Sequence, residues 1–153
     1  SGDDMMLKRM KRRHNSKDVF QFVDRCKKIR KDISFGADII AGFPTETDTM
    51  FENTYKLLRD NEISHLHIFP FSPKNNTPAS RMPQVSKLII KKRAKILRDL
   101  GKLILKKVKS KLLLPREILI EELNSGLAIG YDQNYIKHKV PLVGVPVGEV
   151  IRV

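Results

Sequence analysis

The spacing of apolar positions changes several times along the chain, and the first changes predict a helix followed by a strand. Residues 15–33 carry apolar side chains at steps of three and four, the repeat of an α-helix with one buried stripe, and Ser16 is a candidate N-cap. Residues 34–43 form a nearly continuous apolar run, which is typical of a buried strand. The strand is predicted to stop at Pro44, because proline cannot donate to a central ladder. The buried stripe of the helix is predicted to consist of Val19, Phe22, Val23, Cys26 and Ile29.

The same alternation of helix and strand then repeats. Residues 45–61 return to helical spacing, with Thr45 and Thr47 as capping candidates. Residues 64–71 are a short run of branched and aromatic side chains, which predicts a second strand. Helix, strand, helix and strand with short connections make a βαβ pattern, so we expect an α/β fold with a parallel sheet. Residues 72–83 contain several Pro and Asn and are predicted to form a loop.

Residues 86–112 predict one long and strongly basic helix. They hold eleven Lys or Arg against the single acid Asp99, so this segment carries +10 of the chain's net charge of +13. Gly101 is expected to bend the helix or to allow close packing against a neighbour. The apolar stripe is predicted to consist of Leu88, Ile89, Ile96, Leu100, Leu103, Ile104 and Val108.

The pattern changes again at Pro115, after which short strand-like runs alternate with Gly and Pro turn signals. From about Leu114 to Val153 we expect a small all-β module, an open barrel of five strands. The chain is therefore predicted to contain two domains, residues 1–112 and residues 113–153.

Composition narrows the classes of function. A pI near 10.0 with clustered charge favours a polyanionic partner, most often nucleic acid, over a merely solvated surface. Cys26 is the only cysteine, so the chain forms no internal disulfide, and we expect a reducing, cytoplasmic compartment. No stretch approaches the roughly 20 apolar residues of a membrane helix, and the first residues lack the apolar core of a signal peptide. Because the sequence does not begin with Met, we expect it to be a piece of something longer.

The turn at residues 42–46 is the candidate ligand site of the first domain. Ligands of parallel α/β folds bind at the carboxyl ends of the strands. Gly42 allows an unusual φ or the close approach of a flat ligand, and free backbone groups at a strand end can read an adenine edge. Glu46 is expected to begin the next helix, whose dipole stabilises its charge. The alternative is that Gly-Phe-Pro makes a tight strand-to-helix turn and nothing more.

Four segments in register resemble a known enzyme family. They are SGDDMMLKRMKRRHN, DIIAGFPTETDTMFENT, FPFSPKNNTPASRM and AIGYDQNYIK, in this order. Together they resemble the second half of the radical-SAM tRNA methylthiotransferases, of the type that acts on N6-threonylcarbamoyladenosine, followed by their RNA-binding TRAM domain. The resemblance covers essentially the whole chain. It implies a partial parallel (β/α) barrel fragment at residues 1–112 and a small OB-like TRAM barrel at residues 113–153.

The resemblance also implies a binding site for S-adenosylmethionine across the strand ends. Ser1 and Gly2 are similar to the end of a Gln-Ser-Gly motif, and Arg12 to an arginine that approaches the polar end of the ligand. Asn76 stands where the family usually has Gly, and its tolerance of the left-handed region lets that loop survive. The cofactor-binding residues implied by the resemblance are Ser1, Gly2, Arg12, Ile39, Gly42, Glu46, Phe71 and Ser72.

For the second domain the resemblance implies contact with tRNA. Its aromatic and basic side chains offer stacking and charge, as small barrels do for single-stranded RNA, although some of them must be core. The RNA-binding candidates are Arg116, Tyr131, Tyr135, Lys137, His138 and Lys139.

The resemblance further implies [4Fe-4S] clusters in the intact enzyme, and this chain lacks the cysteines that hold them. A cluster needs three or four thiolates, whereas Cys26 lies on a helix stripe and is expected to be a buried small hydrophobe. The chain alone is therefore expected to be inactive, with no catalytic residue of its own and with a missing N-terminal half as partner. It is read as the C-terminal fragment of such an enzyme, and two alternatives are a non-catalytic basic RNA-binding module and a gene remnant without function.

Two further expectations concern metal binding and assembly. His65 and His67 lie on one face of the second strand, but no third ligand stands at useful spacing, so no metal site is predicted. Half a barrel leaves sheet edges uncovered, so self-association of the isolated chain is expected.

Overall fold

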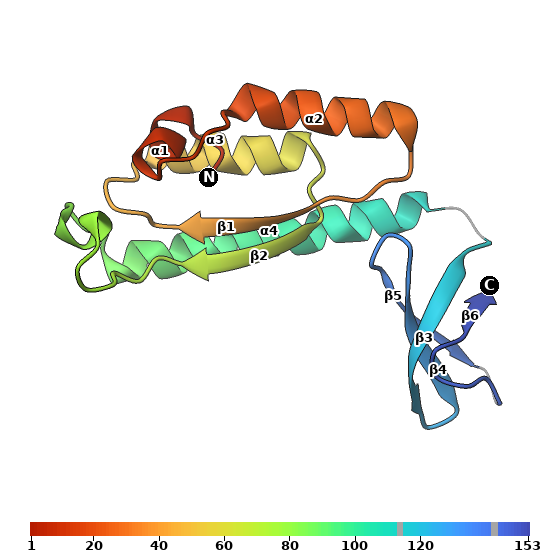
Figure 1. The fold of residues 1–153 in the computed structure, drawn as a ribbon. Helices are drawn as coiled ribbons and strands as arrows, with labels where there is room; N and C mark the ends of the chain where they lie inside the picture. The colour runs from red at the N-terminus through yellow and green to blue at the C-terminus, as the bar shows by residue number, and fades with distance from the viewer. Residues whose placement is uncertain (113–114, 142–143) are drawn as a thin grey trace. The chain divides into compact units, whose positions relative to one another are not determined.

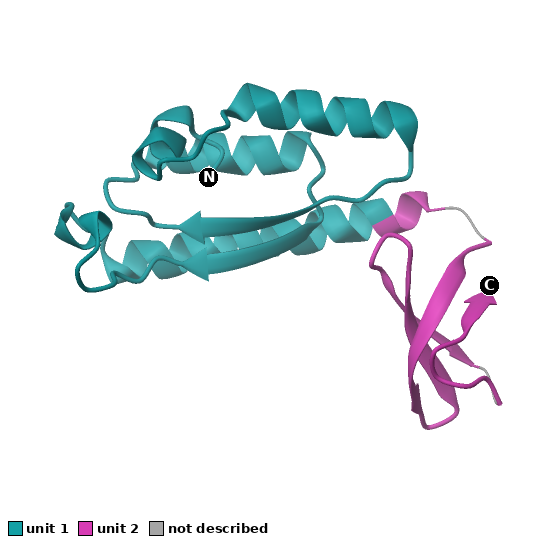
Figure 2. Ribbon diagram, in the orientation of Figure 1, with its two compact units in different colours: residues 1–108 teal, residues 109–153 magenta. Residues whose placement is uncertain are grey.

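The fold consists of two compact units that differ in architecture. The structure, a computed structural model, describes residues 1–112, 115–141 and 144–153. Residues 1–108 form the first unit and residues 109–153 the second (Figure 2). The predicted boundary at 112/113 and the predicted strand start at Leu114 fall on or beside residues outside the described ranges. Among the helices described, none is long and apolar enough to cross a membrane.

The first unit is an α/β layer with a parallel sheet, as predicted. Strands β1 (Gly36–Ala41) and β2 (His65–Pro70) pair in parallel, with Ile39 opposite Ile68. Figure 1 shows helices α2 and α3 running alongside this strand pair. The helices of the unit and its single 3-10 turn are α1 (Asp4–Arg9), α2 (Ser16–Ile29), α3 (Asp48–Asp60), η1 (Pro78–Arg81) and α4 (Lys87–Lys111).

One face of the strand pair is covered by helices α3 and α4. Ile39 and Ile68 point into the core of the unit, where Leu58 of α3 and Leu97 of α4 are almost completely buried. Side chains alternate between the two faces of a strand, so Asp38 of β1 lies on the opposite face, and it is exposed. The sheet is thus buried on one face and open on the other.

The starts of α2 and α3 are fixed by side-chain caps. The N-cap of α2 is Asn15 rather than the predicted Ser16, because its side chain accepts from the Asp18 N–H while Asp18 accepts from the Asn15 N–H. The N-cap of α3 is Thr47, one of the two predicted candidates. Each cap satisfies backbone donors that the first helical turn leaves free.

The predicted stripe of α2 is only partly buried. Val23 is buried, whereas Phe22 is 55% exposed and Ile29 is 88% exposed. The spacing identified the helix correctly but did not identify the face that packs on this unit.

The predicted stripe of α4 is also partly wrong. Leu100 and Ile104 are buried as predicted, but Leu88 and Leu103 are exposed. Residues 88–90 are all apolar, so a helical repeat of apolar positions can start at any of them and the spacing alone does not select the buried face. The residues that α4 buries are Ile90, Arg93, Ala94, Leu97, Leu100, Gly101 and Ile104.

Gly101 explains how α4 lies so close to the sheet. A Cβ atom at this position would come within 3.3 Å of Leu66 on β2, which is tighter than an ordinary contact. The close packing that the sequence offered as one role for Gly101 is therefore what the structure shows.

The second unit is an antiparallel sheet of four strands in the order β5-β4-β3-β6. Its core contains Ile118, Ile120 and Ala128. Four strands are found in the part of this unit that the structure describes, one fewer than the predicted five. The strands are β3 (Glu117–Asn124), β4 (Leu127–Asp132), β5 (Lys137–Pro141) and β6 (Val150–Arg152).

Candidate functional site

The turn that follows β1 begins at a glycine that no other residue can replace without strain. Gly42 has a φ of +75°, in the left-handed region that favours glycine. A Cβ atom there would also collide with the side chain of Ile90 on α4. The unusual φ was predicted, and the close approach to the backbone is made by α4.

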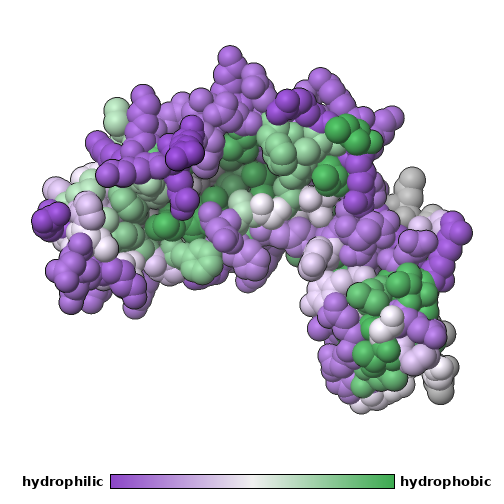
Figure 3. Space-filling model, viewed as in Figure 1, coloured by the Kyte–Doolittle hydropathy of each residue, from purple (hydrophilic) through white to green (hydrophobic). Residues whose placement is uncertain are grey.

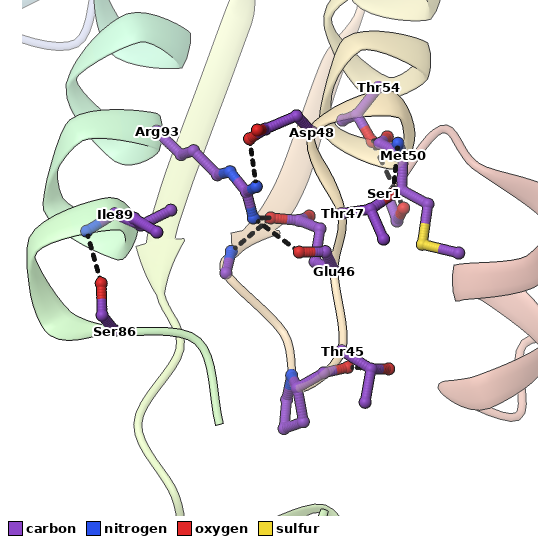
Figure 4. Close-up of polar contacts among 12 residues, drawn as sticks. Ser1, Thr45, Glu46, Thr47, Asp48, Met50, Thr54, Ser86, Ile89 and Arg93 are labelled. Carbon is purple, nitrogen blue, oxygen red and sulfur yellow. Dashed lines mark hydrogen bonds and ion pairs between the residues drawn. The ribbon is translucent and has the colours of Figure 1, made fainter. Parts of the chain in front are cut away.

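Glu46 closes this turn with a buried carboxylate (Figure 4). Its Oε2 accepts a hydrogen bond from the Gly42 N–H at 3.0 Å and pairs with Arg93 Nη1 at 2.8 Å. The helix begins two residues later, at Asp48, so the expectation that Glu46 itself begins the helix is wrong. The Gly42 N–H is already bonded to Glu46 and is not free to read an adenine edge.

Burial raises the pKa of Glu46, and the positive charge of Arg93 and the Gly42 N–H oppose that rise. Removing a carboxylate from water disfavours its charged form, so ionised Glu46 depends on these two partners. Glu46 therefore stabilises the turn, because its carboxylate bonds to the Gly42 N–H and to Arg93.

Arg93 is the residue of this site that the sequence analysis missed. It was counted only as one of the cations on the basic helix, yet it is 5% exposed. Its guanidinium also donates to the Glu46 backbone carbonyl at 3.0 Å and to Asp48 at 2.7 Å, and it lies 5.4 Å from the Phe51 ring centre. Its position between the buried residues Ile90 and Leu97 was the signal that could have revealed it.

Two further segments hold the same turn in place. Arg9 of α1 donates to Thr45 Oγ1 at 2.7 Å, and the Thr45 N–H donates to the Pro83 carbonyl at 3.1 Å. Thr45 has a φ of +67°, which is unusual for a branched residue. Because contacts from three other segments converge here, the turn has one defined conformation.

The predicted cofactor residues of the amino-terminal segment lie beside β1. Ser1, Arg12 and Ile39 line one hollow of about 370 Å³. Gly2 is packed on α3, where its N–H donates to Thr54 Oγ1 at 2.9 Å and a Cβ atom would come within 2.9 Å of Leu57. The structure thus brings three of these four residues to one cavity, while Gly2 fixes the segment that carries Ser1.

Phe71 and Ser72 lie at the adjacent strand end and line a different hollow. It has a volume of about 320 Å³, with Ile90 in its wall and Lys87 beside it. The ring of Phe71 meets Phe43 of the Gly42 turn edge to face, at 5.3 Å between centres. Gly42 and Glu46 line neither hollow, so the eight predicted residues do not share one cavity.

In the second unit, buried Asp132 is the centre of a hydrogen-bond cluster. Its Oδ1 accepts from the N–H groups of Asn134 and Ile136, at 2.8 and 3.0 Å. Its Oδ2 contacts Arg116 Nη1 at 2.8 Å and His138 Nε2 at 3.1 Å. Burial alone would raise the pKa of Asp132, but these donors together lower it.

The predicted RNA-binding residues divide into buried and exposed groups. Arg116 is 5% exposed and pairs with Asp132, so it is a core residue of this unit and does not offer its charge to RNA. Tyr135 is 78% exposed, and its ring centre lies 6.3 Å from that of Tyr131. Lys137 lies 6.0 Å from the Tyr131 ring centre, and Lys139 is exposed.

The remaining candidates, Cys26, His65 and His67, form no site among the residues that the structure describes. Cys26 is a free, half-buried thiol. Among the residues described, no group of three or more His, Cys, Asp or Glu side chains is placed to hold a metal ion, and His65 and His67 belong to no such group.

Comparison with individual known proteins assigns the chain to a family, although no protein-family model matches it. A threonylcarbamoyladenosine tRNA methylthiotransferase of Thermotoga maritima is 39% identical over 155 aligned residues, which cover 97% of this chain and 35% of that protein. The corresponding protein of Rickettsia prowazekii is 61% identical over 101 residues, which cover 66% of this chain and 24% of that protein.

A relative named for a different modified adenosine matches a shorter part of this chain. A tRNA-2-methylthio-N(6)-dimethylallyladenosine synthase of Ehrlichia canis is 40% identical over 83 residues, which are 54% of this chain. The chain belongs to the family of tRNA methylthiotransferases, as its motifs predicted. The relatives that match nearly all of it carry the name threonylcarbamoyladenosine tRNA methylthiotransferase, and the chain spans about a third of their length.

Proposed function

We propose that this chain is the C-terminal part of a tRNA methylthiotransferase that adds a methylthio group to C2 of N6-threonylcarbamoyladenosine in tRNA. The observation that carries the proposal is the 39% identity to the Thermotoga maritima enzyme over 97% of this chain. That match includes both units, so the proposal assigns a role to each. The intact enzyme works on tRNA in the cytoplasm, and its remaining part is the principal partner of this chain.

The first unit contributes part of the wall of an S-adenosylmethionine site. The hollow beside β1 supports this, because it combines the cation Arg12 with apolar Ile39 and the hydroxyl of Ser1. A carboxylate and an adenine ring need a cation and an apolar surface respectively, so these residues fit one part of the ligand. When bound, the ligand supplies the methyl group and the radical precursor.

The residues of this chain do not fit an iron–sulfur cluster. Cys26 is the single thiol, and a cluster requires three or four. Ligands for the clusters and the electron transfer to S-adenosylmethionine must therefore come from the remaining part of the enzyme, and no catalytic step is assigned to residues of this chain.

The chemical task of the first unit is positioning. Glu46 and Arg93 lock the Gly42 turn, and the Phe43–Phe71 contact connects it to the end of β2. A preformed turn does not have to be ordered when ligand binds, so the entropic cost of that ordering is avoided.

The second unit and the exposed lysines of α4 supply tRNA docking. Lysines 91, 95, 102, 106 and 109 of α4 are exposed, and a basic surface attracts RNA phosphates without reading sequence. The same charge also supports the second candidate, a non-catalytic RNA-binding module, which would bind tRNA without any upstream part.

A chimera distinguishes these two functions. This chain replaces the matching third of the Thermotoga maritima relative, and methylthio-modified nucleosides are quantified by mass spectrometry in tRNA from cells that lack the native enzyme. We expect the chimera to restore methylthio modification of the tRNA. A folded, cluster-containing chimera that binds tRNA but leaves it unmodified would instead support the binding module. The matched control is a chimera whose graft carries Lys31→Gln, an exposed position that lines neither proposed hollow.

A further inference from the structure

A row of side chains, three exposed and one half-buried, crosses the four described strands of the second unit. The register places Val150 opposite Leu119, Leu119 opposite Tyr131, and Tyr131 opposite Lys137. Directly opposed residues of neighbouring strands project from the same face. The core residues Ile118 and Ile120 alternate with this row and project from the other face.

Part of the row is apolar surface that is exposed to solvent and is not buried by packing within the unit. Val150 is 61% exposed and Leu119 is 43% exposed, although both lie within strands. Hydrophobic surface is visible on this unit in Figure 3. A contiguous apolar row beside a cation is typical of a binding surface.

The turn between β4 and β5 adds a second aromatic ring to the Tyr131 end of the row. Tyr135 has a φ of +57°, and its N–H donates to the Asp132 carbonyl at 2.9 Å. The Asp132 carboxylate fixes the backbone on both sides of Tyr135, because it accepts hydrogen bonds from the N–H groups of Asn134 and Ile136. The ring of Tyr135 is therefore presented to solvent, tilted by 49° from Tyr131, on a backbone that is already fixed.

Cations lie on the same side of this aromatic pair. Lys137 and Lys139 are two residues apart on β5 and so project from one face, with Lys137 next to the Tyr131 ring. Aromatic faces stack on bases and lysines pair with phosphates, which is the combination that single-stranded nucleic acids require. A protein partner is less well matched, because lysine is depleted in the centres of protein interfaces.

We propose that this row is a subsite for unpaired RNA, in which one base stacks on the exposed face of Tyr135 beside Tyr131. The neighbouring nucleotide lies against Leu119 and Val150, and the backbone phosphates follow Lys137 and Lys139. The inference rests on the proposed function, since it names which state of RNA the docking unit receives. It predicts a preference for unpaired segments over duplex, because the bases of a duplex are not free to stack on protein.

Tyrosine fluorescence tests the stacking directly. The chain has three tyrosines and no tryptophan, so Tyr55→Phe leaves only Tyr131 and Tyr135 as reporters. The full chain with this change is titrated with a short unpaired oligoribonucleotide and with the same sequence as duplex. Stacking of a base quenches tyrosine emission, so we expect quenching by the unpaired RNA and tighter binding of it than of the duplex.

Variants at Tyr135 separate the ring from the turn. Tyr135→Asn removes the ring, and asparagine tolerates a positive φ, so the turn is kept. It should weaken binding of the unpaired RNA by at least about fivefold, the lower range for loss of one stacked base. Tyr135→Phe keeps the ring and should bind like the parent. Gln133→Ala, at an exposed position in the same turn, is the matched control and should also bind like the parent.

The outcomes distinguish failure of this inference from failure of the proposed function. Far-UV circular dichroism first establishes that each variant is folded. Salt-sensitive tRNA binding with no quenching, and with Tyr135→Asn equal to Tyr135→Phe, would overturn the stacking subsite and leave the proposed function standing. No RNA binding by the folded chain would overturn the subsite together with tRNA docking. Self-association that Leu119→Lys abolishes, without quenching by RNA, would show that the row is a protein interface and would also overturn it.

Discussion

At the scale of single residues, both units depend on one buried carboxylate that gathers several donors. Glu46 holds the turn after β1 through Gly42 and Arg93, and Asp132 holds the turn after β4. In each case the partner is an arginine distant in sequence, Arg93 or Arg116. Removing one partner leaves an uncompensated buried charge, which costs far more than the pair contributes when it is intact.

Substitution of Arg93 by Met should strongly destabilise the first unit. The ionised Glu46 carboxylate would lose its cation while staying buried, a loss of about 3 to 5 kcal/mol for a buried pair. Urea denaturation followed by circular dichroism measures it. The double variant Arg93→Met/Glu46→Gln should recover part of the loss, because it buries no unpaired charge. A change of less than about 1 kcal/mol in the single variant would refute the role given to Arg93.

Asp132 should make the second unit sensitive to acid. Its pKa is lowered in the folded state, so the stability it contributes is present above the unfolded value of 3.8 and is lost as pH falls below that value. The tyrosine band of the near-ultraviolet circular dichroism spectrum follows this unit in the Tyr55→Phe background, since Tyr131 and Tyr135 are then the remaining tyrosines. Asp132→Asn should be less stable than the parent at neutral pH and should lose less further stability between pH 4 and pH 2, within roughly two pH units of the unfolded pKa. Parallel pH curves for the two proteins would contradict this expectation.

At the scale of elements, the position of α4 against the strand ends is set by small residues. Gly101 lets α4 approach Leu66, and Gly42 lets Ile90 of α4 contact the backbone of the turn. Both contacts connect segments that are distant in sequence, so they could not be inferred from local spacing.

Gly42→Ala should show two separable costs. The left-handed φ costs an alanine about 1 to 2 kcal/mol, and the collision with Ile90 adds about 1 to 3 kcal/mol of overpacking. Ile90→Ala in the same chain removes Cγ1, the atom that makes the closest contact, so Gly42→Ala should cost less in the Ile90→Ala background than in the parent. Urea denaturation of the four proteins measures the cycle. Additive effects would show that Ile90 does not restrict the turn.

The sequence predicted the elements better than it predicted their contacts. The βαβ order, the parallel pairing and the long basic helix follow from local periodicity, and all are present. The buried face of α4 was missed because Leu88, Ile89 and Ile90 satisfy several stripes at once, and only the approach of β1 and β2 selects Ile90. Arg93 and Arg116 were assigned by their charge, whereas their burial depends on carboxylates that tertiary structure brings to them.

At the scale of the whole molecule, the net positive charge is distributed unevenly between the two units, and residues 109–153 carry almost none of it. The chain carries +13, and most of it lies on α4. Charge of this kind gives affinity for RNA without selecting a sequence or a state. Selection has to come from groups that contact bases, and the exposed aromatic pair of the second unit is the candidate for it.

A salt series with full-length tRNA separates these contributions. The logarithm of the binding constant should fall linearly with the logarithm of salt concentration, and each phosphate contact with unpaired RNA contributes a slope of about 0.7. Lys137→Gln/Lys139→Gln should therefore reduce the slope by about 1.4. Lys17→Gln/Lys31→Gln changes two exposed lysines of the first unit, removes the same total charge, and should leave the slope close to that of the parent.

The two lysine variants decide whether tRNA contact is local or diffuse. Equal reductions of the slope in both would mean that tRNA responds only to the net charge of the chain, and the second unit would lose its docking role. A reduction confined to the β5 pair would place phosphates beside Tyr131 and Tyr135. A third variant, Lys106→Gln/Lys109→Gln on α4, then tests the helix separately. If it also reduces the slope, the RNA path includes α4 as well as the aromatic row, and if it does not, those lysines of α4 are solvated surface.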